Sequence, residues 1–281
     1  MNASWRRALK VAAIAALLVG PDMAPVPAEA QKLPDAIVAR KKIVIALFAS
    51  FPPMAYKRPE DNALAGIDVD LASYFGRKLG VDIAWQEVSY ESATNALTTG
   101  RVDMALSLLD LPEPAAKLDF VDYLSSGIQV YTLAGHAPIA TLADLCGQTV
   151  GANRRNGFDA AMRDWSDKNC VAVGRPALKI EATEGTPAAR LELRQSRVDA
   201  IVQSSESVPY TMKLEPGAYV KVGPAFSTGM MIAMAFPKEA TQLRDAVRAV
   251  LKESIADGSY AAILKKFEVE GNSAADAIAR Q

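Results

Sequence analysis

The sequence predicts an α/β fold in two lobes, and three observations support this prediction. Short apolar runs alternate with helical patterns along the chain, which is typical of α/β proteins. The alternation restarts after residue 123 without a flexible linker, which indicates a second lobe joined to the first by extended segments. The chain has 281 residues, half of them apolar, so it is long enough to bury the cores of about two domains.

The first lobe is expected to open with three strand–helix steps. Its strands are short apolar runs, and its first helix begins with acidic residues and ends at a glycine. The expected strands are 43–48, 82–88 and 102–108, the expected helices are 68–80 and 91–99, and residues 51–56 are expected to form a loop. Short links between these elements imply parallel strands and right-handed crossovers.

The second half of the chain repeats the same rhythm and ends in two helices that are broken at Gly258. The expected strands are 129–134, 149–153, 179–182, 200–203, 220–222 and 230–236. The expected helices are 142–145, 158–169, 187–195, 241–256 and 260–267. No repeat of solenoid length is present.

Composition argues against several classes of function. The chain carries 31 basic and 32 acidic residues without a block of like charge, so no nucleic-acid partner is expected. His136 is the only histidine, and one histidine with two cysteines gives no plausible zinc site and no Ser/His/Asp triad. We therefore expect neither a metal nor a cofactor.

The first thirty residues have the pattern of a secretory signal peptide. Three basic residues precede the apolar run 11–19, which is too short to span a bilayer of about 30 Å, and Ala28-Glu29-Ala30 is a small-x-small cleavage site. We expect cleavage after Ala30 and a periplasmic location; the alternative is a membrane anchor. Arg6-Arg7 leaves open whether export follows the general or the twin-arginine route.

Two cysteines remain, Cys146 and Cys170. An exported chain meets an oxidising compartment, so a disulfide between them is expected. Closing a loop of 24 residues would stabilise the fold by roughly 3 kcal/mol in the chain-entropy model.

A set of ordered motifs then resembles one protein family. The motifs cover nearly the whole chain after residue 30; each alone is weak, and together they are specific. They are Phe51-Pro-Pro-Met-Ala-Tyr56, Gly66-Ile-Asp-Val-Asp-Leu71, Ala96-Leu-Thr-Thr-Gly-Arg-Val-Asp103, Asp119-Phe120, 142–151, Ser196-Arg-Val-Asp-Ala200, Ala256-Asp-Gly-Ser-Tyr260 and 263–267. In this order and spacing they resemble family 3 of the bacterial extracellular solute-binding proteins.

The resemblance implies a type II periplasmic-binding-protein fold with a hinge and a discontinuous first lobe. The expected division is 1–30 signal peptide, 31–127 with 228–281 as lobe 1, and 128–227 as lobe 2. It further implies a monomer that binds a small-molecule ligand between closing lobes and delivers it to an ABC transporter permease in the inner membrane. The two cysteines also resemble a disulfide found in some branches of the family.

Site residues follow from the same resemblance. In the first lobe, the family places an aromatic residue against the ligand after the first strand and polar contacts after the third. In the second lobe, backbone donors at a helix start bind the ligand's carboxylate. The expected ligand-binding residues are Phe51, Tyr56, Ser107, Leu109, Asp110, Arg154, Arg155, Asn156, Phe158 and Ser204.

Two departures from the family pattern concern the ligand's head group. Between Ser107 and Tyr123 the family carries an arginine for the α-carboxylate, but this chain has none, and Pro114 stands about where it should be. The family's aspartate for the α-amino group is replaced by Ser204. Each charge-assisted bond is worth roughly 1.5–3 kcal/mol, so losing both would lower the affinity for a standard amino acid by several decades.

Nearby charges leave several compensations open. Asp110 and Glu113 would favour a cationic or amine-bearing ligand; the alternative is that both side chains face solvent, as most acidic residues do. Lys117 is the only cation nearby, and a lysine does not copy bidentate arginine geometry. Arg154 or Arg155 would supply a carboxylate clamp from the other lobe, and Glu206 would substitute for the missing aspartate if the strand end shifted.

Three functions remain open at this point. The first is an importer receptor for a small polar or charged solute that is not a standard α-amino acid. The second is a cyclohexadienyl-dehydratase-like enzyme, with Glu184 or Glu206 as general acid. The third is an accessory protein of periplasmic quinoprotein dehydrogenases, in which Phe51, Leu109, Leu111 and Met230 would fill the cleft.

Overall fold

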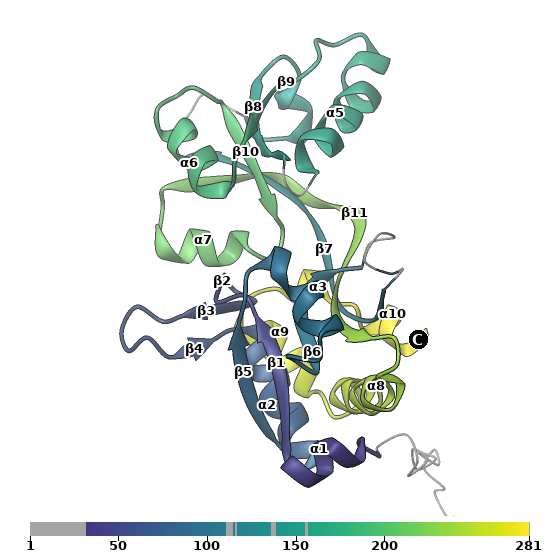
Figure 1. Cartoon of the computed structure of the whole chain (residues 1–281). Helices are drawn as coiled ribbons and strands as arrows, with labels where there is room; N and C mark the ends of the chain where they lie inside the picture. The colour runs from purple at the N-terminus through teal and green to yellow at the C-terminus, as the bar shows by residue number, and fades with distance from the viewer. Residues whose placement is uncertain (1–31, 111–114, 116, 136–138, 155–156, 281) are drawn as a thin grey trace, which may run out of the picture.

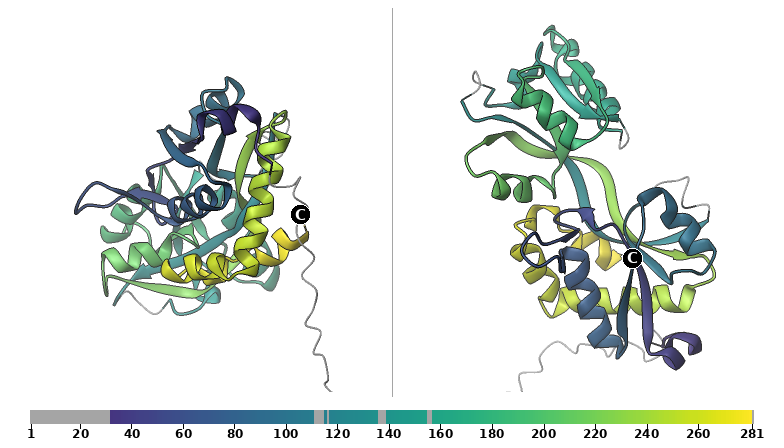
Figure 2. Two further views of the ribbon diagram at one scale, coloured as in Figure 1. Left: turned by 90° about the horizontal axis from the view of Figure 1, so that it is seen from below. Right: turned by 60° about the vertical axis from the view of Figure 1, so that its left-hand side comes forward.

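The computed structural model describes residues 32–280 apart from 111–114, 116, 136–138 and 155–156. Two lobes are joined by a pair of long strands, β7 (Leu118–Leu133) and β11 (Tyr219–Pro237), which run side by side from one lobe into the other (Figure 1). Figure 2 shows the same two strands crossing the waist between the lobes.

A single eight-stranded sheet extends through both lobes in the order β5-β1-β6-β11-β7-β10-β8-β9. A separate small sheet has the order β2-β3-β4. The remaining strands are β1 (Lys42–Leu47), β2 (Ser50–Phe51), β3 (Ala55–Lys57), β4 (Leu64–Ala65), β5 (Asp82–Glu87), β6 (Met104–Leu109), β8 (Thr149–Asn153), β9 (Lys179–Thr183) and β10 (Ala200–Ser204).

The pairing directions show that the parallel strands of each lobe run toward the junction between the lobes. β11 runs from the second lobe into the first and pairs antiparallel with β6, so β6 and its parallel neighbours β1 and β5 run toward the second lobe. β7 runs the opposite way and pairs antiparallel with β10, so β10 and its parallel neighbours β8 and β9 run toward the first lobe. The carboxyl ends of both parallel sets therefore meet at the junction.

Helices cover the sheet in each lobe. In the first lobe α2, α8 and α9 pack together, with α1 and α10 near the chain ends (Figure 1); α5, α6 and α7 belong to the second. Their bounds are α1 (Asp35–Arg40), α2 (Ile67–Leu79), α3 (Tyr90–Thr98), α5 (Phe158–Asn169), α6 (Thr186–Arg194), α7 (Val208–Leu214), α8 (Thr241–Ala256), α9 (Ser259–Lys266) and α10 (Ala275–Arg280), with 3-10 turns η2 (Leu142–Leu145), η4 (Val171–Val173) and η5 (Glu270–Asn272). Among the described residues, none of these helices has the length and apolar character needed to cross a membrane.

The first lobe is built from both ends of the chain. Its largest apolar cluster combines early residues such as Ile37 and Phe75 with late ones such as Val247 and Ile278. The second lobe has a cluster of its own between Ile128 and Val222. This division confirms the predicted two-lobe α/β fold with a discontinuous first lobe.

The structure differs from the sequence expectations mainly at the crossings. β7 begins at Leu118, well before the expected start at residue 129, and 220–222 and 230–236 are two parts of the single strand β11. Residues 51–56 were expected to form a loop, but Ser50–Phe51 and Ala55–Lys57 pair as β2 and β3. These short antiparallel strands lack the length from which an apolar pattern is read.

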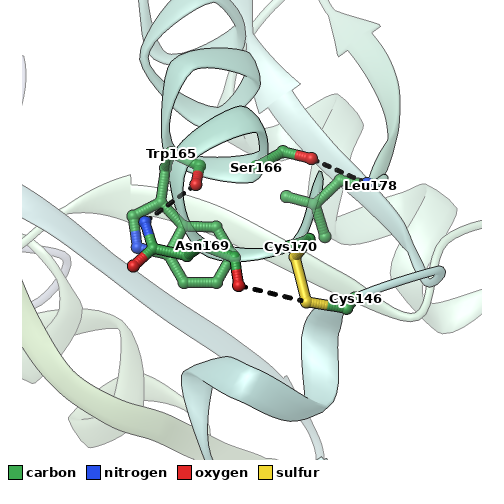
Figure 3. Close-up of a disulfide and its surroundings, with 6 residues drawn as sticks. All are labelled: Cys146, Trp165, Ser166, Asn169, Cys170 and Leu178. Carbon is green, nitrogen blue, oxygen red and sulfur yellow. Dashed lines mark hydrogen bonds between the residues drawn. A yellow bond between two sulfur atoms is a disulfide. The ribbon is translucent and has the colours of Figure 1, made fainter. Parts of the chain in front are cut away.

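The predicted disulfide is present. Cys146 follows η2, and Cys170 ends α5, with their Cα atoms 5.6 Å apart. Figure 3 shows the bond beside the last turn of α5, where Ser166 accepts the N–H of Leu178 at 2.9 Å. The bond therefore ties the end of α5 to the segment that leads into β8.

Candidate ligand-binding site

The first-lobe half of the site gathers at the carboxyl ends of β1, β5 and β6. Phe51 is half-buried against the first-lobe core, and Leu109 packs on the same core. Two residues that sequence reasoning missed lie beside them: the rings of Phe48 and Tyr90 are 5.5 Å apart, and the Tyr90 hydroxyl accepts the N–H of Leu109 at 3.4 Å. Their signal in the sequence is position alone, since Phe48 ends one expected strand and Tyr90 comes two residues after another.

Ser107 and Asp110 have opposite environments. Ser107 is only 3% exposed, and its hydroxyl donates to the buried carboxyl of Asp68 at 2.7 Å. Asp110 is exposed, and its N–H donates to the carbonyl of Met231 at 3.1 Å. Asp110 is thus a carboxylate open to solvent at the end of β6. Leu111, Glu113 and Pro114 lie outside the described residues.

The second-lobe half begins at the end of β8. The guanidinium of Arg154 lies 3.1 Å from the carboxylate of Glu184 and donates to the carbonyl of Ala182 at 3.2 Å. Phe158, the first residue of α5, is 3% exposed and belongs to the second-lobe core. Acting as a carboxylate clamp would require Arg154 to leave Glu184; the two neighbours in the expected set, Arg155 and Asn156, lie outside the described residues.

Ser204 is the last residue of β10 and is half-buried at the junction. Its hydroxyl donates to Ser207 at 3.1 Å. The nearest acid in sequence, Glu206, is 1% exposed and accepts from the hydroxyl of Ser126 at 3.0 Å. Burial raises the pKa of Glu206, although hydrogen bonds from Ser204, Ser126 and Ser205 oppose that shift.

The C-terminal segment that holds Asn272 also contacts the end of β10. The side-chain amide of Asn272 donates to the hydroxyl of Ser205 at 2.6 Å and to the carbonyl of Ser125 at 2.8 Å. The N–H of Ser205 in turn donates to the carbonyl of Gly127 at 2.9 Å. A chain of hydrogen bonds thus links the end of β10 to the first lobe across the crossing strands. No pattern in the sequence predicted this link.

Tyr56 lies in β3, which pairs with the strand that holds Phe51, and it also faces the second lobe. Its ring is 4.9 Å from that of Tyr210 in α7, a contact that joins the two lobes. Both rings line a pocket of about 480 Å³ that also includes Pro53, Pro59, Lys213 and Phe267. Of the eight expected ligand-binding residues that the structure describes, Tyr56 alone lines this pocket.

The arrangement suits binding. Aromatic and polar side chains from both lobes stand at the facing carboxyl ends of parallel strands, the usual position of ligands in open α/β sheets. Within the described part of the chain, no group of three or more histidine, cysteine, aspartate or glutamate side chains is placed to hold a metal ion.

Comparison with known proteins gives the same fold. The chain is 24% identical over 247 residues to an arginine-binding protein of Corynebacterium glutamicum, covering 88% of this chain and 80% of that one. It is 27% identical over 221 residues to an L-cystine-binding protein of Bacillus subtilis, covering 78% of each. Among solved structures, an ancestral amino-acid-binding protein, described as a precursor of cyclohexadienyl dehydratase, superposes with a TM-score of 0.65 at 24% identity, over 83% of this chain and 97% of that one.

The family model of bacterial extracellular solute-binding proteins, family 3, matches residues 43–270. That span includes both halves of the site and both crossing strands. The similar proteins named above are named for binding, and the type II two-lobe fold is the one they share. The chain belongs to family 3 of the bacterial extracellular solute-binding proteins.

Proposed function

We propose that this protein is the periplasmic receptor of an ABC importer and captures a small polar or charged organic solute that is related to amino acids but is not a standard α-amino acid. Lobe 1 would comprise 31–127 and 228–281, and lobe 2 would comprise 128–227, closing on the ligand at the junction. Family membership supports the receptor role. Phe51, Tyr56, Ser107, Leu109, Asp110, Arg154, Arg155, Asn156, Phe158 and Ser204 remain the proposed ligand-binding set.

One observation carries the choice of substrate. Ser204 holds the position expected of an α-ammonium acceptor, and the acid two residues later, Glu206, is buried against Ser126. A hydroxyl accepts a hydrogen bond but does not neutralise an ammonium. On the other lobe, no arginine occurs between Ser107 and Tyr123. The similar proteins that bind arginine or cystine therefore do not fix the ligand of this chain.

The available charges favour an amine-bearing ligand. Asp110 is exposed at the end of β6, whereas Arg154 is already paired with Glu184. The aromatic residues Phe51 and Tyr90 offer apolar surface to an aliphatic stem or a cation. Choline, putrescine and opine-type conjugates are compounds of this chemistry.

A thermal-shift screen tests the proposal. The disulfide-bonded protein is unfolded and refolded to remove any co-purified ligand, and is then screened against choline, putrescine, octopine, succinate, L-arginine, L-histidine and L-cystine. A ligand at 100 times its Kd stabilises the folded state by about 2.7 kcal/mol, which gives a clear rise in Tm.

We expect a hit outside the standard amino acids. Tight binding of L-arginine, L-histidine or L-cystine would overturn the substrate assignment but not the receptor role. No shift with any compound would count against the receptor role and favour an accessory protein.

A second candidate, a dehydratase acting on prephenate, is favoured by a buried acid. Burial at the end of β10 raises the pKa of Glu206, and a shift in this direction favours the protonated form that a general acid uses. The reaction would release water and carbon dioxide from prephenate and leave phenylpyruvate. Formation of phenylpyruvate by the purified protein, lost in Glu206→Gln, would establish this activity; its absence at high protein concentration would dismiss it.

A further inference from the structure

β6 is kinked three residues after it begins. Ala105 pairs with Ala235 and Leu108 with Ala233, so Leu106 and Ser107 together face the single residue Met234 of β11. Ser107 has a φ of 59°, in the left-handed region that serine rarely adopts. This is a β-bulge, which turns the side chains that follow it and is frequent beside functional sites.

Two side chains from other elements hold the bulge. The carboxyl of Asp68, in the first turn of α2, accepts the hydroxyl of Ser107 at 2.7 Å and that of Tyr123, in β7, at 2.5 Å. The oxygen of Tyr123 also accepts the N–H of Ser107 at 3.2 Å. All three residues are nearly inaccessible, at 0%, 3% and 0% for Asp68, Ser107 and Tyr123.

We propose that Asp68 and Tyr123 are positioning residues for ligand binding, because they hold the Ser107 bulge and thereby set the direction of Leu109 and Asp110 at the junction. The inference rests on the proposed receptor function for its ligand, but the geometry of the bulge does not depend on that function. Neither Asp68 nor Tyr123 is placed to touch a ligand, since both are enclosed in the first-lobe core.

The electrostatics of Asp68 favour a positioning role over a packing role. Burial raises its pKa to about 7, against the two hydroxyl donors, and no cation contributes to the shift. Asp70, two residues after Asp68 on α2, is paired with Lys266 outside the core. A buried carboxyl without a cation lowers stability, so packing alone would be served better by an apolar side chain. What the carboxyl supplies is two directed acceptors for Ser107 and Tyr123.

Tyr123→Phe is the informative variant because it removes only the hydroxyl. The matched control is Tyr260→Phe, which removes another buried hydroxyl from the same core, one that donates to the carbonyl of Tyr123 and accepts the N–H of Ala274. Both are made in the full disulfide-bonded protein. Amide hydrogen exchange in D2O is followed by NMR at Asp110, whose N–H bonds Met231 across the strands.

We expect exchange at Asp110 to become at least tenfold faster in Tyr123→Phe and to stay within twofold of the parent in Tyr260→Phe. Adding Ser107→Gly to Tyr123→Phe should bring the rate back toward that of the parent, because glycine adopts a φ near 59° without support. Equal exchange in the two single variants, or no rescue by glycine, would overturn the proposal.

Binding is then measured by calorimetry with choline and with putrescine. For a compound that binds the parent, we expect Kd to rise at least tenfold in Tyr123→Phe and less than twofold in Tyr260→Phe. An unchanged Kd in Tyr123→Phe would overturn the positioning role. If neither compound binds the parent, these two amines are excluded as ligands, and the exchange measurements still decide whether Asp68 and Tyr123 hold the bulge.

Discussion

At the scale of single residues, Asp68 makes the stability of this protein depend on pH. Its pKa is about 7 in the folded state against 3.8 for an unburied aspartate, so the folded state holds the proton more tightly than the unfolded state. Stability therefore falls as pH rises from about 4 to about 7. A change of this size corresponds to at most about 4 kcal/mol.

We predict that Asp68→Asn removes this fall. Urea unfolding between pH 4.5 and 7.5 should show a gain in stability of the variant over the parent that grows with pH. Asp257→Asn should instead lower stability by the same amount at every pH in this range, because the hydroxyl of Tyr74 lowers the pKa of Asp257 to about 2. The stability that its carboxylate contributes is lost only as the pH falls below about 4. If Asp68→Asn changed the free energy of unfolding by the same amount at every pH, the prediction would be contradicted.

The proposed substrate class rests on Ser204, which stands where the family pattern has an aspartate. We predict that Ser204→Asp raises affinity for L-arginine by at least tenfold, because an aspartate there would give the α-ammonium a charged acceptor. Calorimetry with L-arginine measures the gain, and Ser204→Asn is the control of equal size without charge. Equal affinities of the two variants would show that charge at this position is not what excludes α-amino acids.

At the scale of elements, the crossing of β7 and β11 leaves no space for a side chain at Gly127. A Cβ there would lie 2.7 Å from the carbonyl oxygen of Phe226. We predict that Gly127→Ala destabilises the protein by about 1–3 kcal/mol, since the strands must move apart. Urea unfolding measures the loss. Gly271→Ala, which meets no atom within 4 Å, is the matched control and should change stability much less.

The disulfide acts at the same scale by linking η2 to the end of α5. We predict that Cys146→Ser with Cys170→Ser lowers the free energy of unfolding by about 3 kcal/mol, mainly because the unfolded chain regains the freedom of a 24-residue loop. Chemical unfolding under non-reducing conditions tests this, and the same loss should follow reduction of the parent. A loss in the double variant but none on reduction would point to packing around the sulfur atoms.

Many elements could be predicted because their residues carry a clear period. Thr149–Asn153, Phe158–Asn169 and Thr241–Ala256 have the expected bounds, since apolar runs and amphipathic spacing report burial directly. The first part of β7 was missed because serines and aspartates interrupt its apolar pattern. α7 was missed because Pro209 stands in its first turn, where proline is compatible with a helix but is more often read as a break.

The site was less predictable than the fold. Resemblance located the strand ends, but it did not reveal that Ser107 donates into the core, that Phe158 is buried, or that Glu206 is enclosed by serines. Side-chain direction depends on a bulge and on contacts between segments far apart in the sequence, and neither leaves a local pattern. The ligand-binding assignments accordingly remain predictions.

At the scale of the whole molecule, side-chain contacts join the lobes beside the crossing strands. Tyr56 and Tyr210 form the only ring contact between the lobes among the described residues. We predict that Tyr210→Ala widens the range of lobe orientations and increases the radius of gyration in small-angle X-ray scattering. Tyr219→Phe, within the second lobe, should leave it unchanged. Identical scattering of Tyr210→Ala and parent would mean that the crossing strands alone fix the arrangement.

The discontinuous first lobe has a consequence for the order in which the protein is assembled. During synthesis from the N-terminus, the buried second-lobe cluster is complete once Val222 has been added, whereas the first-lobe core still lacks its buried residues from Ile232 to Ile278. The lobe whose sequence starts first is therefore completed last. An interrupted or C-terminally truncated chain would carry a finished second lobe attached to an open hydrophobic face, the kind of surface that chaperones and proteases recognise.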